Sequence, residues 1–279
     1  MLDSTIQAAG GDSAISADFE AFRQRAYRIT GLDLTAYKAP QMQRRLLVLL
    51  GRVQVQTFAQ YATLLERDPA RRQEFRDYVT INVSEFFRDG DRFGELERRI
   101  LPDLVTHAGM RGLSVWSAGC SMGAEPYSLA ILLREVGPGR HHQVLATDID
   151  RTILTRAQEG CGYTAADLRN VGQDRIDRWF ERQPDGSYCL GPVPRALVTF
   201  QQHDLLRDAY PDGPFDLIAC RNVVIYFTDA AKERIYASFA RALRVGGVLF
   251  VGGTEAILKP QALNLQVLGP GFYRRLPPA

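Results

Sequence analysis

A glycine-containing turn followed by an acid is the first group of residues that could do chemistry. The turn, residues 118–123, contains Gly119 and Gly123 and lies between an expected strand and an expected helix, where a Rossmann-like sheet receives a nucleotide. Its spacing is G-x-x-x-G, and Glu125 near the helix start would repel an anionic ligand such as a pyrophosphate. An adenosine that carries a positive sulfonium and an ammonium group fits this position better. The alternative is a turn that is only structural.

Asp148 is the second candidate, at the tip of the next expected strand and 25 positions after Gly123. An acid at this place can accept hydrogen bonds from both hydroxyls of a ribose. The alternative role is to cap the following helix, which Asp150 could fill equally well. Taken together, the turn and the acid favour nucleoside binding.

Two further segments offer polar groups to the same crevice. Asn222 and Tyr226 follow another expected strand and offer an amide and a phenol, although an ordinary strand end would look the same. At the joint between the two halves of the chain, Phe86 and Phe87 precede Arg88. Arg88 could pair bidentately with a carboxylate, or it could form a structural salt bridge.

These residues depend for their positions on a predicted parallel sheet after residue 100. Short apolar runs alternate there with helical runs, which predicts βαβ units and a buried parallel sheet. We expect strands at 113–117, 143–147, 215–220 and 247–251, helices at 125–136, 150–159 and 229–243, and a closing hairpin of 263–268 and 272–275. A small β insertion is predicted at about 184–200, from the β-forming segments 187–190 and 197–200.

The first part of the chain has helical spacing and no strand signal. We expect a disordered tail at 1–15, an all-helical domain at 16–83, and a linker with a connecting helix at 84–100. Ser16 is a suitable cap for the first helix, and Pro40 opens the second. The second helix is expected to turn apolar residues inward and basic residues outward, namely Met42, Leu46, Leu47 and Leu50 inward and Lys38, Arg44, Arg45 and Arg52 outward.

Composition and charge narrow the class of protein. The 279 residues are 46% hydrophobic, and no stretch is apolar enough to span a membrane or to act as a secretory signal, so we expect a cytoplasmic protein. Residues 19–88 hold twelve Lys/Arg against seven Asp/Glu, which indicates an acidic partner or a solvated helix face. The four cysteines lack C-x-x-C spacing and are expected to be reduced, and the histidine spacing predicts no metal site.

Together these segments resemble the CheR-type chemoreceptor glutamate O-methyltransferases. The resemblance runs from about Phe19 to Arg275 and is carried by Asn82-Val83-Ser84-Glu85-Phe86-Phe87-Arg88, Trp116-Ser117-Ala118-Gly119-Cys120-Ser121, Glu125-Pro126-Tyr127-Ser128, Ala146-Thr147-Asp148-Ile149-Asp150, Phe215-Asp216 and Cys220-Arg221-Asn222-Val223-Val224-Ile225-Tyr226-Phe227. Several separated motifs in the right order are far more specific than any one of them.

The resemblance implies an α/β fold. A class I S-adenosylmethionine-dependent methyltransferase domain, Rossmann-like and with a small β-subdomain insertion, would occupy residues 101–279 after an all-α N-terminal domain. S-adenosyl-L-methionine would be the methyl donor and S-adenosyl-L-homocysteine the product. With Gly119 from the turn, the cofactor-binding candidates are Asn82, Ser84, Arg88, Gly119, Glu125, Asp148, Asp204, Leu205, Asn222 and Val223.

The resemblance also implies a substrate and a partner. The expected reaction is methyl transfer to glutamate carboxylates in the cytoplasmic domains of chemoreceptors, the methyl-accepting chemotaxis proteins, giving glutamyl methyl esters. Arg88 and Tyr226 take the family's substrate-side positions as catalytic candidates. The family's receptor-facing basic helix falls on the segment with Lys38, Arg44, Arg45 and Arg52.

The chain departs from the family in two places. Residues 122–125 read Met-Gly-Ala-Glu where the family usually has Thr-Gly-Glu-Glu, so one of two acids is lost and small changes in cofactor affinity are expected. The loop 183–194 is short and lacks the glycine-rich stretch of members that bind a receptor's C-terminal pentapeptide. We therefore do not expect docking on such a tail.

Other functions remain open at this point. A non-catalytic module that senses S-adenosylmethionine is opposed by the presence of Arg88, Asn222 and Tyr226. A methyltransferase acting on another acidic partner fits the same residues, whereas nucleic acid as substrate would call for base-binding and stacking sequences that we do not find. A dinucleotide oxidoreductase is weakened by the turn spacing and by Glu125. The chain has no heptads, so we expect a monomer that neither binds nucleic acid nor inserts into a membrane.

Overall fold

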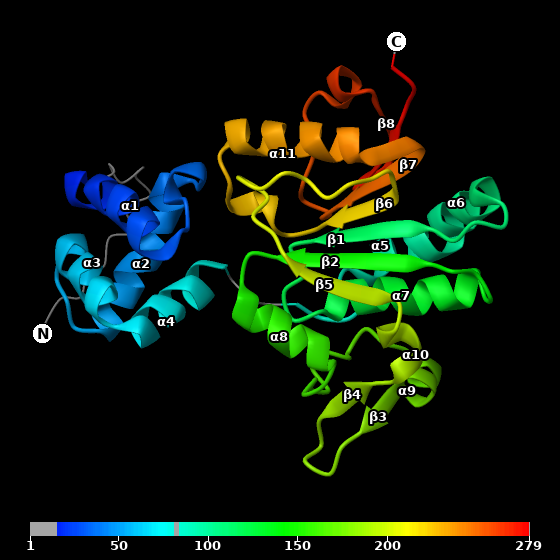
Figure 1. Ribbon diagram of the computed structural model, residues 1–279, viewed down its shortest axis with the longest axis horizontal. Helices are drawn as coiled ribbons and strands as arrows, with labels where there is room; N and C mark the ends of the chain where they lie inside the picture. The colour runs from blue at the N-terminus through cyan, green and yellow to red at the C-terminus, as the bar shows by residue number, and fades with distance from the viewer. Residues whose placement is uncertain (1–15, 81–83, 279) are drawn as a thin grey trace, which may run out of the picture. The chain divides into compact units, whose positions relative to one another are not determined.

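The computed structural model describes residues 16–80 and 84–278. The expected tail at 1–15 and the cofactor candidate Asn82 lie outside the described residues. The chain divides into two compact units, one of Met1–Arg76 with Tyr226–Thr228 and the other of Asp77–Ile225 with Asp229–Ala279. The described part of the first unit is helical, and the second unit contains the sheets (Figure 1).

The helical unit is built around an aromatic core. Its elements are α1 (Ala17–Thr30), η1 (Leu34–Ala36), α2 (Ala39–Arg52), α3 (Phe58–Arg67) and α4 (Pro69–Thr80), the last of which runs on into the second unit. The Ser16 hydroxyl accepts a hydrogen bond from the Phe19 amide at 3.1 Å, as predicted for a cap. Phe22 is buried and its ring centroid lies 5.9 Å from that of Tyr61 in α3, so aromatic packing holds α1 on α3.

The inward face of α2 differs from the prediction at one position. Met42, Leu46 and Leu50 are buried as expected, but Leu47 is 48% exposed and Leu49 takes the buried place. The reason is the 3.6-residue period, which puts residues at steps of four, seven and eight from Met42 on one stripe and rotates Leu47 out of it.

The second unit contains a mostly parallel sheet. Within the described residues its strand order is β5-β2-β1-β6-β7-β9-β8, and only β9 runs antiparallel to its two neighbours. The bounds are β1 Ser114–Ala118, β2 Gln143–Asp148, β5 Val198–Gln202, β6 Phe215–Cys220, β7 Leu243–Val251, β8 Leu265–Gly269 and β9 Phe272–Arg275. The predicted parallel sheet and closing hairpin are confirmed. The strand order reverses between β1 and β6, and ligands of such sheets bind at the carboxyl ends of the strands beside this point.

Helices cover both faces of this sheet. In Figure 1, α7 lies along one face and α11 along the other. Alternation within β1 serves both sides, because Val115 joins the core beneath α7 while the Trp116 ring lies 5.3 Å from that of Phe239 in α11. The remaining helical elements are α5 Gly90–Glu95, the π-helical turn η2 Leu96–Ile100, α6 Leu101–Ala108, α7 Ala124–Val136, α8 Arg151–Glu159, α9 Gln173–Trp179, α10 Pro192–Arg195, η3 Val224–Tyr226, α11 Asp229–Ala242 and η4 Pro260–Leu263.

The small β insertion pairs differently from the prediction. Strands β3 (Phe180–Arg182) and β4 (Tyr188–Leu190) form a separate antiparallel sheet, which projects below α9 and α10 in Figure 1. The other expected strand of the insertion, 197–200, belongs to β5 and pairs in parallel with β2. Packing of Phe200 stabilises this segment on the main sheet, because the centre of its ring lies 5.6 Å from that of Tyr127 in α7.

The prediction of four reduced cysteines is wrong for two of them. A disulfide joins Cys161 to Cys189, and an antiparallel bridge between Tyr163 and Tyr188 brings their segments together. Sequence spacing hid this pair, because 28 positions separate the two cysteines. Cys120 and Cys220 are free, and burial raises the pKa of both thiols well above the usual value.

Asp216 at the amino end of β6 is an electrostatic anchor of the sheet. Its side chain is 3% exposed and receives both terminal nitrogens of Arg111 at 2.7 Å, Nε of Arg244 at 3.1 Å and the Ser114 amide at 2.9 Å. Burial works to raise the pKa of Asp216, but the two guanidinium groups and the amide outweigh it and hold the pKa below its ordinary value.

Asp216→Asn is expected to lower the free energy of unfolding by about 1–3 kcal/mol near neutral pH. Because the pKa is lower in the folded protein, this stabilisation is present above the unfolded value of about 3.9 and is lost as the pH falls through the folded value. Urea unfolding of wild type and variant across this range measures the difference, with the exposed Asp212→Asn as the matched control. Equal stability at neutral pH would contradict the assignment.

No helix among residues 16–80 and 84–278 is both long and apolar enough to cross a membrane.

Candidate functional site

The turn after β1 brings two of the predicted cofactor-binding residues, Gly119 and Val223, into contact. Gly119 has a φ of 83°, and its amide donates to the carbonyl oxygen of Thr147 in β2 at 2.8 Å. A Cβ atom added at Gly119 would stand 2.4 Å from Cγ2 of Val223, closer than two carbon atoms can approach. Glycine is therefore required here by both its backbone angle and its contact, and Val223 after β6 closes against the turn.

Asp148 ends β2 beside this turn. It is 8% exposed, and its two oxygens accept hydrogen bonds from the amides of Ser121 at 2.8 Å and Asp150 at 3.0 Å. Asp150 caps α8 by accepting two amides of the first turn, so the cap role belongs to Asp150. Each oxygen of Asp148 can accept one more hydrogen bond. Burial raises the pKa of Asp148, and the amides oppose this shift.

Glu125 lies in the first turn of α7 with its carboxylate buried. Ser117 of β1 donates its hydroxyl to Oε1 of Glu125 at 2.8 Å, and Nη1 of Arg221 lies 3.8 Å from Oε2. Burial raises the pKa of Glu125, while the charges of Arg221 and Arg88 lower it. The acid predicted at the helix start therefore faces cations within the site.

The Arg88 segment is held by its backbone. The Phe87 amide donates to the Ser128 hydroxyl at 3.0 Å, and Nη2 of Arg221 donates to the carbonyl oxygen of Arg88 at 2.8 Å and to Oδ2 of Asp89 at 2.6 Å. Phe87 and Asp89 both have positive φ angles, so the chain turns sharply on each side of Arg88. Arg88 itself is half-buried.

Arg221 is a residue of the candidate site to which the sequence analysis gave no role. Its side chain is 1% exposed, and its guanidinium lies 4.7 Å from the centre of the Phe250 ring and 5.1 Å from that of Phe93. The arginine therefore links the end of β6 to the Arg88 segment. A signal was present, because an arginine directly after the apolar run 217–220 of a buried strand stands at the edge of the core, where a charged side chain requires a partner.

Asn222 follows Arg221 with a φ of 60°, the left-handed region. Its backbone amide donates to Oε2 of Glu255 at 2.8 Å. Among the described residues, the Asn222 Oδ1 and the Ser121 Oγ are buried and have no hydrogen-bond partner. A buried polar atom of this kind costs about 1–3 kcal/mol, so both atoms are suited to a polar ligand.

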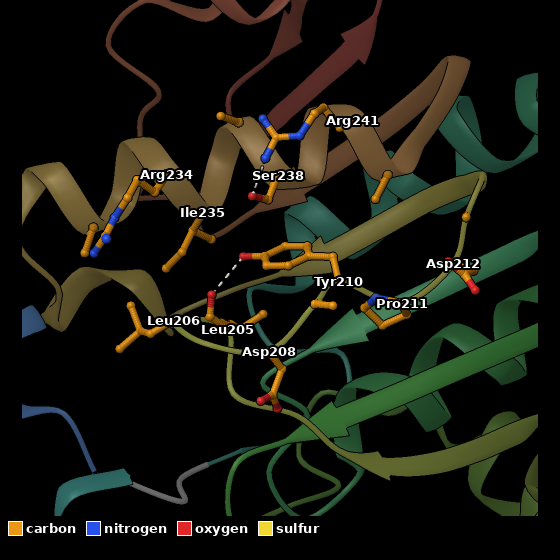
Figure 2. A pocket seen from close by; sticks show the side chains of 15 residues that line it. Leu205, Leu206, Asp208, Tyr210, Pro211, Asp212, Arg234, Ile235, Ser238 and Arg241 are labelled. Carbon is orange, nitrogen blue, oxygen red and sulfur yellow. Dashed lines mark hydrogen bonds between the residues drawn. The ribbon is translucent and has the colours of Figure 1, made fainter. Parts of the chain in front are cut away.

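The remaining predicted site residues that the structure describes are Asp204, Leu205 and Ser84. Asp204 accepts the Leu206 amide at 2.8 Å, and burial raises its pKa. Leu205 lines a groove of about 650 Å³ between the segment 205–213 and α11, where Tyr210 donates its hydroxyl to the Leu205 carbonyl (Figure 2). Ser84 is half-buried. The residues described contain no group of three side chains that could hold a metal ion.

Tyr226 belongs to the helical unit, whereas Arg88 belongs to the unit with the sheet. The Lys38 amide donates to the Tyr226 carbonyl at 3.0 Å, and the Arg45 guanidinium lies 5.8 Å from the centre of the Tyr226 ring. Of the partner candidates, Arg44 and Arg52 are exposed, and Lys38 and Arg45 are half-buried.

Comparison with known families decides what this arrangement is. Residues 82–268 match the family described as CheR methyltransferase, SAM binding domain, and residues 17–80 match the CheR methyltransferase, all-alpha domain.

The chain belongs to the CheR methyltransferase family.

Relatives agree over most of the chain. A chemotaxis protein methyltransferase of Listeria innocua is 42% identical over 260 residues, covering 93% of this chain and 97% of that protein. Chemotaxis protein methyltransferase 1 of Pseudomonas aeruginosa is 33% identical over 275 residues, covering 94% and 99%. Among solved structures, a TehB-like SAM-dependent methyltransferase of Corynebacterium glutamicum has a TM-score of 0.36 at 18% identity, covering 62% of this chain and 83% of that one, which is too distant to argue function.

As a CheR methyltransferase, the protein uses S-adenosylmethionine as its methyl donor. The residues present fit this cofactor. The buried acceptors on Asn222 and Asp148 suit hydroxyl and amino donors, and the buried carboxylate of Glu125 suits a cationic ligand rather than a phosphate.

Proposed function

We propose that this CheR methyltransferase transfers the methyl group of S-adenosylmethionine to glutamate side-chain carboxylates of chemoreceptors, giving glutamyl methyl esters. Relatives that are named chemotaxis protein methyltransferases support the setting. The observation that carries the proposal is the place of Arg88, a guanidinium whose charge acts on buried Glu125 and whose backbone Arg221 holds. A cation fixed at this rim can receive an acidic acceptor side chain.

The acceptor needs no general base. A free glutamate has a pKa of about 4.3, so its carboxylate is already ionised near neutral pH. The cofactor supplies a methyl group on a positive sulfur, and the carboxylate oxygen bonds to that carbon as the carbon–sulfur electron pair passes to sulfur. The protein orients and desolvates two groups whose charges cancel during transfer. Arg88 would steer the carboxylate, and Tyr226 would donate a hydrogen bond near the methyl group.

The cofactor would lie across the carboxyl ends of β1, β2 and β6. Asp148 would accept the ribose hydroxyls, and Glu125 would balance the positive charge of the methionine end. Asn222 and Val223 would contact the ligand from the end of β6, and Asp204 and Leu205 from the segment after β5. Ser84, Asn82 and Arg88 would contact it from the segment before α5.

Methyl-transfer assays test the proposal. Incubation with methyl-labelled S-adenosylmethionine and cytoplasmic receptor fragments should label the receptor, and mild base should release the label as methanol because a methyl ester hydrolyses. Mass spectrometry should place the added methyl on glutamate. Cofactor binding without transfer to any receptor would favour a sensing module, and a base-stable label would point to another acceptor atom.

The exposed face of α2 supports an acidic helical partner. Arg44, Val48 and Arg52 are spaced by four residues and therefore share one face, with Leu47 beside them. Leu47 and Val48 are 48% and 53% exposed, so this face combines positive charge with accessible apolar surface. An acidic receptor helix with some apolar residues would complement it.

Reversing the charge of this face should slow receptor methylation. The double variant Arg44→Glu, Arg52→Glu is expected to lower kcat/KM for receptor fragments by about 10-fold at low salt, because it removes attraction and adds repulsion. The difference should shrink as salt is added. The matched control is Arg28→Glu, an exposed arginine of α1 in the same unit. An equal fall in kcat/KM for variant and control, or no fall in either, would show that this face of α2 is only a solvated surface.

A further inference from the structure

Glu255 is a buried acid at the end of β6 and β7 to which the sequence analysis gave no role. It stands in the segment after β7 and is only 6% exposed. Its Oε2 accepts the Asn222 amide at 2.8 Å and the Gly252 amide at 2.6 Å. One carboxylate oxygen therefore joins the carboxyl ends of two neighbouring parallel strands, since Cys220 and Val251 are partners in the sheet.

We propose that Glu255 is a positioning residue of the cofactor site. Its carboxylate holds the backbone of Asn222 in the left-handed conformation and so directs the side-chain amide of Asn222 toward the cofactor. This inference rests on the cofactor role proposed above for Asn222. In this inference Glu255 acts through Asn222 rather than by binding the cofactor itself.

The backbone of Asn222 is held by such a partner. Asparagine enters the left-handed region at a smaller cost than the about 1–2 kcal/mol of most residues with a side chain, so contacts of comparable strength decide whether Asn222 keeps its φ of 60°. The hydrogen bond from the backbone amide of Asn222 to the charged carboxylate of Glu255 is a contact of this strength. Without it, the chain after β6 can relax and turn the Asn222 side chain away.

The neighbouring residues are shaped around this carboxylate. A Cβ atom at Gly252 would stand 2.4 Å from Oε2 of Glu255 and 3.2 Å from the Asn222 backbone nitrogen, so a side chain at this position would displace the carboxylate. Burial raises the pKa of Glu255, while the two amides and the charge of Arg221 lower it and favour the carboxylate. The Asn222 Oδ1 held in this way is buried and has no partner among the described residues.

The same carboxylate is linked to the rest of the site through Arg221. Arg221 precedes Asn222 directly and carries the bonds to the Arg88 carbonyl and to Asp89. A shift of the chain at Asn222 would therefore be felt in the cofactor contacts first and in the Arg88 segment next. This order predicts an effect on cofactor affinity that exceeds the effect on turnover.

The test compares Glu255→Ala and Glu255→Gln in the full chain. The alanine variant should weaken binding of S-adenosylhomocysteine, measured by calorimetry, by about 10- to 100-fold, the range for losing hydrogen bonds to a charged acceptor. The KM for S-adenosylmethionine should rise in step, with kcat changed far less. Glutamine keeps an oxygen for both amides and should restore most of the affinity, so it serves as the conservative rescue. If the alanine protein does not fold, Glu255→Asp takes its place, because the shorter side chain draws the carboxylate back from both amides.

Two further measurements separate positioning from a purely structural role. Asp216→Asn, a buried acid at the other end of β6, should lower stability without changing the affinity for S-adenosylhomocysteine. In a double-mutant cycle, Glu255→Ala and Asn222→Ala should cost less together than the sum of their separate losses, because both act through the Asn222 side chain.

The inference is overturned if folded Glu255→Ala, or Glu255→Asp in its place, binds S-adenosylhomocysteine as tightly as wild type, or if the losses in the cycle simply add. Product binding needs no acceptor, so these results are independent of whether glutamate is the methylated residue. A chain that binds the product through Glu255 and Asn222 yet fails to methylate receptors would support the inference and contradict the proposed function.

Discussion

Arg88→Ala should lower methyl transfer to receptor fragments by about 100-fold or more, the range for removing a group that aligns or stabilises charge during reaction. The bonds that shape this segment use main-chain atoms and the neighbouring side chains, since Phe87 donates its amide to Ser128 and Arg221 binds the Arg88 carbonyl. We therefore expect the alanine variant to keep these bonds and to fold. The loss should appear as reduced activity rather than as unfolding.

Two variants make the Arg88 result interpretable. Arg88→Lys keeps the charge without the planar pair of donors and should fall between wild type and alanine. Arg99→Ala, an exposed arginine that pairs with Glu95 outside the site, is the matched control and should retain activity. Initial rates with labelled S-adenosylmethionine and thermal unfolding should be measured side by side. Near wild-type turnover of Arg88→Ala would remove this residue from the mechanism.

Asp148→Asn should weaken binding of S-adenosylhomocysteine by about 10- to 100-fold, because a buried carboxylate that accepts hydroxyl donors is replaced by a neutral amide. Both oxygens of Asp148 already accept a backbone amide, so the amide nitrogen of asparagine would also face a donor. Calorimetry gives the affinity. Asp150→Asn is the matched control, because asparagine caps a helix as well as aspartate and Asp150 caps α8.

The affinity should also depend on pH with a definite sign. Burial raises the pKa of Asp148 above the ordinary value of about 3.9, so the carboxyl takes up a proton at a higher pH than an exposed aspartate does. Wild-type affinity should therefore fall as the pH drops toward that raised pKa. Burial raises the pKa of Glu125 as well, so the pH dependence that remains in Asp148→Asn measures the share of Glu125. A pH-independent affinity in wild type would contradict both assignments.

The sheet and its strand ends could be predicted because local patterns decide them. A parallel strand buried on both faces reads as an apolar run, and a polar residue directly after it must lie at the carboxyl edge. Asp148 ends β2, Gly119 directly follows β1, and Asn222 stands two positions after β6. Their meeting at one crevice therefore needs only the order of strands and the usual hand of their connections.

The partners that hold these residues could not be predicted because they depend on distant packing. Glu255 stands 33 positions after Asn222, in a segment with no periodic pattern, and only the pairing of β6 with β7 brings them together. The same holds for the disulfide between Cys161 and Cys189, which depends on the bridge between Tyr163 and Tyr188 of β4. Leu47 shows a different limit, since its exposure depends on which of several apolar positions of α2 face the core.

The cofactor should lie at the carboxyl ends of β1, β2 and β6, and a crystal structure with bound S-adenosylhomocysteine tests this position. We expect the ribose hydroxyls within hydrogen-bond distance of Asp148, the amino-acid end beside Glu125, and the Asn222 amide in contact with the ligand. Product bound at another place, with Asp148 and Glu125 as they are without it, would contradict the account.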